Sequence, residues 1–216
     1  MAILANGPNG GFSGKAGSVV GYYLYGKWVI RGLPRLSRKN KIGSPMQKLY
    51  RSRFSKMQTF LRPFLGFIRV GFNLEARLRG NSAINSANSW NMQHGFLENG
   101  DIDYSAIKVS SGNLPGAVNA QVAAGEDGLV FTWADNSEDD RSNRKDVSRH
   151  SDQVMLLAYD MKDRFVCQVL SGARRSECKA ILKVSDQPGS EWHTWIAFIS
   201  DDRESIATSV YTGMVI

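Results

Sequence analysis

The sequence predicts an α+β protein in which a basic β-hairpin and an amphipathic helix precede an antiparallel β-sandwich. From residue 102 onward, short β-prone runs alternate with turn signals, whereas residues 44–61 show the apolar period of a helix. The chain has 216 residues, of which 42% are hydrophobic, enough to form a real core. We therefore expect a basic region over residues 1–100 and a sandwich domain over residues 101–216.

The N-terminal region opens with a glycine-rich segment followed by a predicted hairpin. Residues 7–17 contain five glycines, so no regular element is expected there. Their N–H groups could cradle a phosphate, but the segment matches no Walker motif and is more typical of a turn or a flexible arm. Residues 18–33, SVVGYYLYGKWVIRGL, contain two β-prone runs with Gly26-Lys27 as the turn between them.

A helix is predicted to begin after Ser44. The Ser44 hydroxyl can cap it, Pro45 suits its first turn, and Gln47 can complete a capping box. Its apolar arc consists of Met46, Leu49, Tyr50, Phe54, Met57, Phe60 and Leu61. Arg53 lies inside this arc, so we expect its cation to meet an acidic surface or a ligand and not only the protein's own core.

Further helices and a set of short strands are predicted downstream. Pro63 should end or kink the first helix, residues 64–78 should form a second helical segment, and residues 83–96 should include a short helix. The predicted strands are Ile102–Ser110, Leu129–Trp133, Gln153–Tyr159, Arg164–Leu170, Cys178–Val184, His193–Ile199 and Ser209–Val215. Seven short strands are typical of an immunoglobulin- or fibronectin-like sandwich, although the Cys…Trp…Cys pattern of antibody domains is absent.

The two cysteines, Cys167 and Cys178, are too few for a disulfide framework or a zinc site. If Gly172-Ala173 is a two-residue hairpin turn, the two thiols face each other across the hairpin. We expect free thiols there, and a disulfide is the alternative.

The distribution of charge is the strongest functional signal. Residues 1–80 contain 15 Lys and Arg and one acid, Glu75, a balance of +14, while the remainder carries −7. Such asymmetry indicates contact with a polyanion, or contact between unlike halves of two molecules. The predicted polyanion-binding residues are Lys27, Arg31, Arg35, Arg38, Lys39, Lys41, Lys48, Arg51 and Arg62. The candidates for stacking on bases are Tyr22, Tyr23, Tyr25 and Trp28.

The sequence gives little support for catalysis, and we expect no enzyme activity, cofactor or metal. None of His94, His150 and His193 has a nucleophile at motif spacing, and no G-x-S-x-G, P-loop or H-E-x-x-H motif occurs. The loop from Asp135 to Asp140 is rich in oxygen ligands and could hold Ca²⁺, but it lacks the glycine and the spaced glutamate of an EF-hand. A solvated loop is the favoured interpretation.

Several long segments carry a resemblance to a known family. They include GGFSGKAGSVVGYYLYGKWVIRGLPR, QKLYRSRFSKMQTFLRPF, IDYSAIKVSSGNLPGA, FTWADNS and WIAFISDDRESIATSVYTG. The chain resembles a family of Bacteroidota proteins known only as a domain of unknown function. The N-terminal pattern is also similar to phage-associated structural proteins, in which a Thr is common near the helix start where this chain has Ser44. The resemblance supplies no site residues and implies only a structural or virion-type role.

These observations lead to three hypotheses about function. The first is a non-enzymatic binding or structural protein whose basic half contacts nucleic acid or another polyanion electrostatically. The second is a self-assembling protein, a homo-oligomer or virion-like assembly in which the basic half packs on the acidic sandwich of a neighbouring copy. The third is a carbohydrate-binding sandwich using Trp192 and Trp195. We expect a cytoplasmic or virion-associated protein, since neither a signal peptide nor a membrane span is visible.

Overall fold

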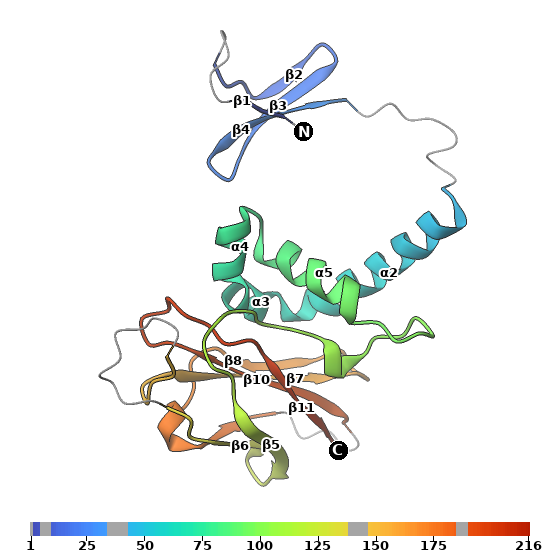
Figure 1. The fold of residues 1–216 in the computed structure, drawn as a ribbon. Helices are drawn as coiled ribbons and strands as arrows, with labels where there is room; N and C mark the ends of the chain where they lie inside the picture. The colour runs from blue at the N-terminus through green and yellow to red at the C-terminus, as the bar shows by residue number, and fades with distance from the viewer. Residues whose placement is uncertain (1, 5–9, 34–42, 138–146, 185–189) are drawn as a thin grey trace. The chain divides into compact units, whose positions relative to one another are not determined.

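The computed structural model describes residues 2–4, 10–33, 43–137, 147–184 and 190–216 (Figure 1). By its contacts the chain divides into two compact units, Met1–Arg51 and Ser52–Ile216. The division expected at residue 100 stays a prediction. The helices that follow Ser52 share one hydrophobic core with the strands of the second unit.

The first unit contains a four-stranded antiparallel sheet in the order β1-β4-β3-β2. The strands are β1 (Ala2–Leu4), β2 (Gly14–Ala16), β3 (Val19–Leu24) and β4 (Lys27–Gly32). The predicted hairpin is confirmed as β3 and β4. Its turn is Tyr25-Gly26, one residue earlier than expected, with φ values of 48° and 79° that suit a two-residue turn between twisted strands.

The glycine-rich segment contains a strand, so the expectation of no regular element there is wrong. Ala16 pairs with Val19 across a tight turn whose Gly17 has a φ of 57°. Glycine adopts this left-handed conformation at little cost, and the open edge of β3 supplies the hydrogen-bonding partner. Pairing with a neighbouring strand therefore outweighs the weak β propensity of Gly14–Ala16.

Helix α2 (Pro45–Leu61) begins as the sequence predicts. The Ser44 hydroxyl accepts a hydrogen bond from the Gln47 N–H at 3.2 Å, and the Gln47 side chain accepts one from the Ser44 N–H at 3.1 Å. This reciprocal pair is the expected capping box. The apolar arc has two different environments, because Met57, Phe60 and Leu61 are buried whereas the apolar residues of the first turns are exposed.

The helical segments after Pro63 are shorter than expected. A 3-10 turn, η1 (Arg62–Phe64), leads into α3 (Leu65–Gly71) and α4 (Asn73–Arg79), which are separated at Phe72. Helix α4 ends on Gly80 with a φ of 62°. Helix α5 (Ala83–His94) confirms the short helix predicted in this region, and the Ser82 hydroxyl caps it.

Two antiparallel sheets follow the helices. One has the order β11-β10-β7-β8 and the other the order β5-β6-β9. The strands of the first sheet are β7 (Gln153–Asp160), β8 (Val166–Val169), β10 (Trp192–Ile199) and β11 (Val210–Val215). Those of the second sheet are β5 (Val118–Gly125), β6 (Gly128–Ala134) and β9 (Lys179–Leu182).

Six of the seven predicted strands are confirmed with small shifts of their ends, and two differences stand out. Residues 102–110 form no strand, because Asp103 caps a 3-10 turn, η2 (Tyr104–Ala106), and the Asn91 side chain binds both the N–H and the carbonyl of Lys108. Strand β5 was not predicted, since its sequence VNAQVAAG is rich in alanine and glycine.

The second unit has three layers: helices, the β11-β10-β7-β8 sheet, and the β5-β6-β9 sheet (Figure 1). One hydrophobic cluster joins Phe64 and Phe67 of the helical layer to Leu157 and Trp195 of the larger sheet. A second cluster fills the space between the two sheets. Because helices cover one face of the larger sheet, its central strands β7 and β10 are buried on both faces. Among the described residues, no helix is both long enough and apolar enough to cross a bilayer.

The predicted hairpin between the two cysteines is wrong. Strand β8, which contains Cys167, pairs with β7, whereas Cys178 precedes β9, which pairs with β6 in the other sheet. The chain therefore crosses between sheets at the point where a tight turn was expected. Neither cysteine forms a disulfide, as expected of small half-buried side chains.

A buried arginine ties together the loops at one end of the sandwich. The Arg175 Nε donates to the Asp152 carboxylate at 3.1 Å, and both side chains are almost completely buried. Its terminal nitrogens donate to the Asn136 side chain at 2.6 Å and to the Pro115 carbonyl at 2.9 Å. Its guanidinium lies 3.8 Å from the centroid of the Phe198 ring. Residues from four separate segments therefore all contact the guanidinium of Arg175.

We expect Arg175→Met to lower the free energy of unfolding by about 3–5 kcal/mol, because it leaves the Asp152 carboxylate buried without its counter-ion. Urea denaturation followed by tryptophan fluorescence measures this loss. Lys179→Met, which removes an exposed cation on β9, is the matched control and should change stability by less than about 0.5 kcal/mol. Equal stability of the two variants would contradict the role assigned to Arg175.

Candidate polyanion-binding surface

The hairpin divides its cations and aromatic rings between two faces. The register pairs Tyr23 with Trp28 and Tyr22 with Val29. Since successive side chains of a strand point to opposite faces, Tyr23 and Trp28 share one face, while Tyr22 shares the other with Lys27 and Arg31. The four aromatic residues predicted to stack on bases thus do not form a single platform.

The Tyr23 and Trp28 face is partly covered by the glycine-rich segment. The two rings meet edge to face, with centroids 5.1 Å apart. A Cβ added to Gly11 would lie 2.2 Å from the Trp28 ring, and one added to Gly21 would lie 2.5 Å from the Phe12 carbonyl oxygen. These close approaches require glycine. Trp28 is consequently half-buried, whereas Tyr23 is 59% exposed.

The opposite face of the hairpin combines cations with an aromatic ring. The Arg31 guanidinium lies 6.0 Å from the centroid of the Tyr22 ring, at the outer limit of a cation–π contact. Lys27 and Arg31 are exposed, and Lys27 makes no ion pair with a described carboxylate. Tyr25 extends from the turn and is 51% exposed. This face therefore presents positive charge beside accessible ring surface.

The cations of α2 and the turn after it are also accessible. Lys48, Arg51 and Arg62 are exposed, and neither Lys48 nor Arg62 forms an ion pair within the described part of the chain. Lys56 of the same helix is different, because its ammonium lies 2.7 Å from the Asp101 carboxylate. The remaining four predicted contacts, Arg35, Arg38, Lys39 and Lys41, fall outside the described residues.

The Arg53 guanidinium contacts an aromatic ring within the protein. Its guanidinium lies 5.5 Å from the centroid of the Phe96 ring, and its buried Nε has no hydrogen-bond acceptor among the described residues. The structure thus gives this cation a partner within the protein, and its contact with an acidic surface or a ligand stays a prediction. A cation–π contact satisfies a cation on an apolar arc without any acid.

Asp135, Ser137 and His150 come together without the geometry of a catalytic triad. The Ser137 hydroxyl donates to Asp135 Oδ1 at 2.6 Å and lies 2.7 Å from His150 Nδ1. The Asp135 carboxylate is 3.5 Å from the same Nδ1 atom. A triad requires the acid and the nucleophile on different ring nitrogens. The hydrogen bonds from Ser137 lower the pKa of Asp135, with His150 adding to the effect.

Other potential ligand sites in the sandwich have simpler explanations. No group of three His, Cys, Asp or Glu side chains suited to a metal lies within the described ranges, and residues 138–140 of the acidic loop are outside them. Trp192 and Trp195 lie on opposite faces of β10, in the two different hydrophobic clusters, and both are buried. Neither indole offers an exposed face for a sugar ring.

His193 lies in a stack of aromatic rings on β10. Its ring is 3.9 Å from that of Tyr104, nearly parallel to it, and its Nδ1 is 2.8 Å from the Tyr211 hydroxyl. Burial lowers the pKa of His193, and Glu191 acts in the opposite direction. Burial likewise raises the pKa of Tyr104 and Tyr211. The folded protein thus favours the neutral imidazole, which packs between the Tyr104 ring and the Tyr211 hydroxyl.

Protonation of His193 should destabilise the fold. Because the folded pKa lies below the usual value of 6.5, the unfolded chain takes up the proton first, and stability should fall as the pH drops below 6.5. Urea denaturation midpoints, measured at several pH values from about 7.5 down to about 5, test this expected fall in stability. His193→Phe should flatten the decline. If the stability of this variant falls with pH as steeply as that of the wild-type protein, groups other than His193 cause the fall.

The comparisons with known proteins identify one family. The model of the Family of unknown function (DUF6266) matches residues 11–213, almost the whole described chain, so this protein belongs to that family. No curated protein matches the chain. No solved structure matches it either.

Proposed function

For this member of the DUF6266 family, we propose a non-catalytic binding role in which the basic N-terminal half holds nucleic acid or another polyanion. The observation that carries this proposal is a surplus of exposed cations without acids. No Asp or Glu occurs before Glu75, whereas residues 1–74 contain 13 Lys and Arg. Ordinary solvated surfaces mix both signs of charge, so such a segment attracts a polyanion.

The chemistry available on the described cations suits backbone contacts more than base reading. Lys27 and Lys48 are flexible point charges, and Arg31 lies beside an aromatic ring. The sequence contains no recognisable base-reading motif, and Tyr23 and Tyr25 are exposed rings at separate positions of the hairpin. Binding should therefore depend on salt and depend little on sequence.

A matched pair of double variants tests this proposal. Lys27→Glu with Lys48→Glu reverses two exposed cations of the basic half, and Lys179→Glu with Lys183→Glu makes the same change in net charge on the sandwich. In fluorescence anisotropy with a short single-stranded oligonucleotide, the first pair should weaken binding by about tenfold or more. It should also reduce the slope of log K against log salt by about one for each lost phosphate contact.

The control pair should leave most of the affinity intact. Equal losses in both pairs would mean that only net charge matters, and the basic half would then have no specific role. Absence of binding by the wild-type protein at about 50 mM salt would contradict the proposal directly.

Self-assembly is a second candidate, favoured by exposed apolar side chains on α2. Met46, Leu49, Tyr50 and Phe54 are 59%, 45%, 57% and 50% exposed, and they occupy one arc of the helix. Exposed apolar patches mark contact surfaces. Because the cations beside this arc would repel an identical helix, the fitting partner surface is the acidic sandwich of a neighbouring copy.

Sedimentation velocity over a range of concentrations tests this second candidate. Leu49→Ser with Phe54→Ser should shift the protein toward monomer. Leu97→Ser with Phe165→Ser, which changes the same residue types at 46% and 51% exposure, should not. A wild-type protein that stays monomeric at every concentration would exclude assembly through α2.

The identity of the sandwich and its setting are part of the same proposal. In chain order, the first, second and fifth strands form one sheet, and the third, fourth, sixth and seventh form the other. An immunoglobulin constant-type domain differs only in that its fourth strand joins the first sheet. This similarity supports an immunoglobulin- or fibronectin-like sandwich. The Bacteroidota origin and the virion-type role rest on the sequence resemblance.

A further inference from the structure

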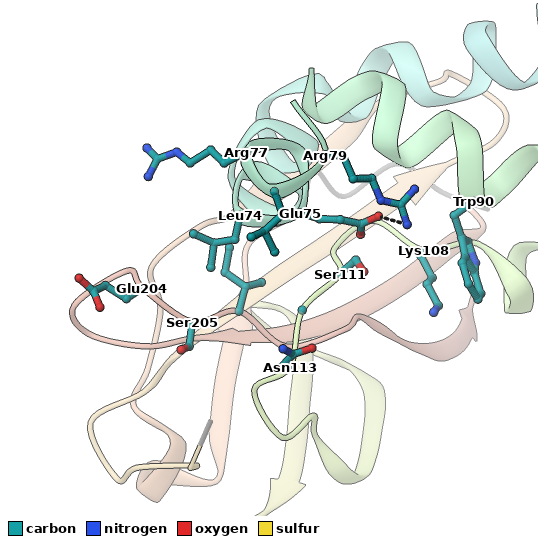
Figure 2. Close-up of a pocket in the computed structure, with 13 residues that line it drawn as sticks. Leu74, Glu75, Arg77, Arg79, Trp90, Lys108, Ser111, Asn113, Glu204 and Ser205 are labelled. Atoms are coloured by element: carbon teal, nitrogen blue, oxygen red, sulfur yellow. Dashed lines mark ion pairs between the residues drawn. The ribbon is translucent and has the colours of Figure 1, made fainter. Parts of the chain in front are cut away.

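The second unit contains a cavity of about 520 Å³. Leu74 of α4 lies on one side, Trp90 of α5 and Lys108 lie on another, and Asn113 comes from a loop beneath (Figure 2). Leu78 and Ile206 also line the cavity. Its volume lies within the usual range for small-molecule sites. Its walls come from α4, α5 and two loops.

Lys108 is the unusual group in this cavity. Its ammonium lies 3.4 Å from the centroid of the Trp90 ring, and no carboxylate lies within ion-pair distance of it among the described residues. The nearest acid of the lining, Glu75, is already paired with Arg79 at 2.8 Å. Burial lowers the pKa of Lys108, and the Glu75 charge opposes this shift.

This arrangement leaves a partly desolvated cation without a counter-ion. The Trp90 ring offsets some of the cost of desolvation, but a ring provides less stabilisation than an anion. Figure 2 shows the Arg77 and Glu204 side chains directed away from Lys108 toward the opposite end of the cavity. Lys108 is therefore the cation placed to receive an anion beside the Trp90 ring.

Leu74 and Leu78 of α4 supply the apolar part of the lining together with Ile206, beside polar and charged residues of the same walls. Leu78 is 88% exposed, whereas Ile206 is buried. A ligand that covered Leu78 would bury apolar surface now in contact with water. The cavity thus combines the Lys108 ammonium with an apolar stretch of wall, alongside the Glu75–Arg79 ion pair.

We propose that this cavity binds a small amphipathic carboxylate, with its anionic group at Lys108 and its hydrocarbon body along Leu74, Leu78 and Ile206. Asn113 and Ser111 supply polar groups near the anionic end. This binding is independent of the polyanion contact assigned to the basic half, since it uses none of the same residues.

Isothermal titration with three probes separates the two parts of the recognition. Octanoate carries both the anion and the hydrocarbon body, octanol carries only the body, and acetate carries only the anion. The wild-type protein should bind octanoate. Octanol and acetate should each bind at least about tenfold more weakly than octanoate. Octanol binding as tightly as octanoate, or no heat with octanoate, would overturn the proposal.

Substitutions at two positions locate the binding. Lys108→Met should weaken octanoate binding by about tenfold, whereas Lys108→Arg should preserve most of it, since the cation remains. Leu78→Asp, at an exposed position that the fold tolerates, should also abolish binding by placing a carboxylate beside the ligand. Circular dichroism checks that each variant is folded. Unchanged octanoate affinity in folded Lys108→Met or Leu78→Asp would refute this location.

Discussion

The double-sided burial of strands β7 and β10 is the constraint on which the second unit depends. Along β7, Val154, Leu156 and Ala158 face the β5-β6-β9 sheet, while the alternate residues Met155 and Leu157 face the helices. A two-sheet sandwich would leave the second set in water. The helices from α2 to α5 are thus a structural layer that completes the sheet, and they lie ahead of it in the chain.

The same constraint separates two roles within α2. Its last turns are committed to the core through Met57, Phe60 and Leu61, so their sequence is limited by packing. Its first turns carry exposed cations and exposed apolar side chains, and these do not pack into the described core. Residues freed from packing in this way are available for binding. The basic hairpin is similar, since its charge contributes nothing to the buried core.

Local chemistry made much of this fold predictable. The capping residues Ser44 and Gln47 located the start of α2, and unbroken apolar runs located β7 and β10. Features that depend on pairing between distant segments were not predictable. Strand β5 has a weak sequence but a strong partner in β6, and the assignment of Cys167 and Cys178 to different sheets requires the topology. The cations of the candidate surface were visible in the sequence, whereas the partnership of Arg53 with Phe96 and the cavity around Lys108 arise only from folding.

We expect the basic N-terminal half, in which no acid precedes Glu75, to bind a polyanion. Size-exclusion chromatography with light scattering, run with and without a short single-stranded oligonucleotide at low and high salt, measures this binding. A complex with the combined mass of protein and oligonucleotide should form at low salt and be lost at high salt. An identical mass with and without the oligonucleotide at low salt would exclude such binding.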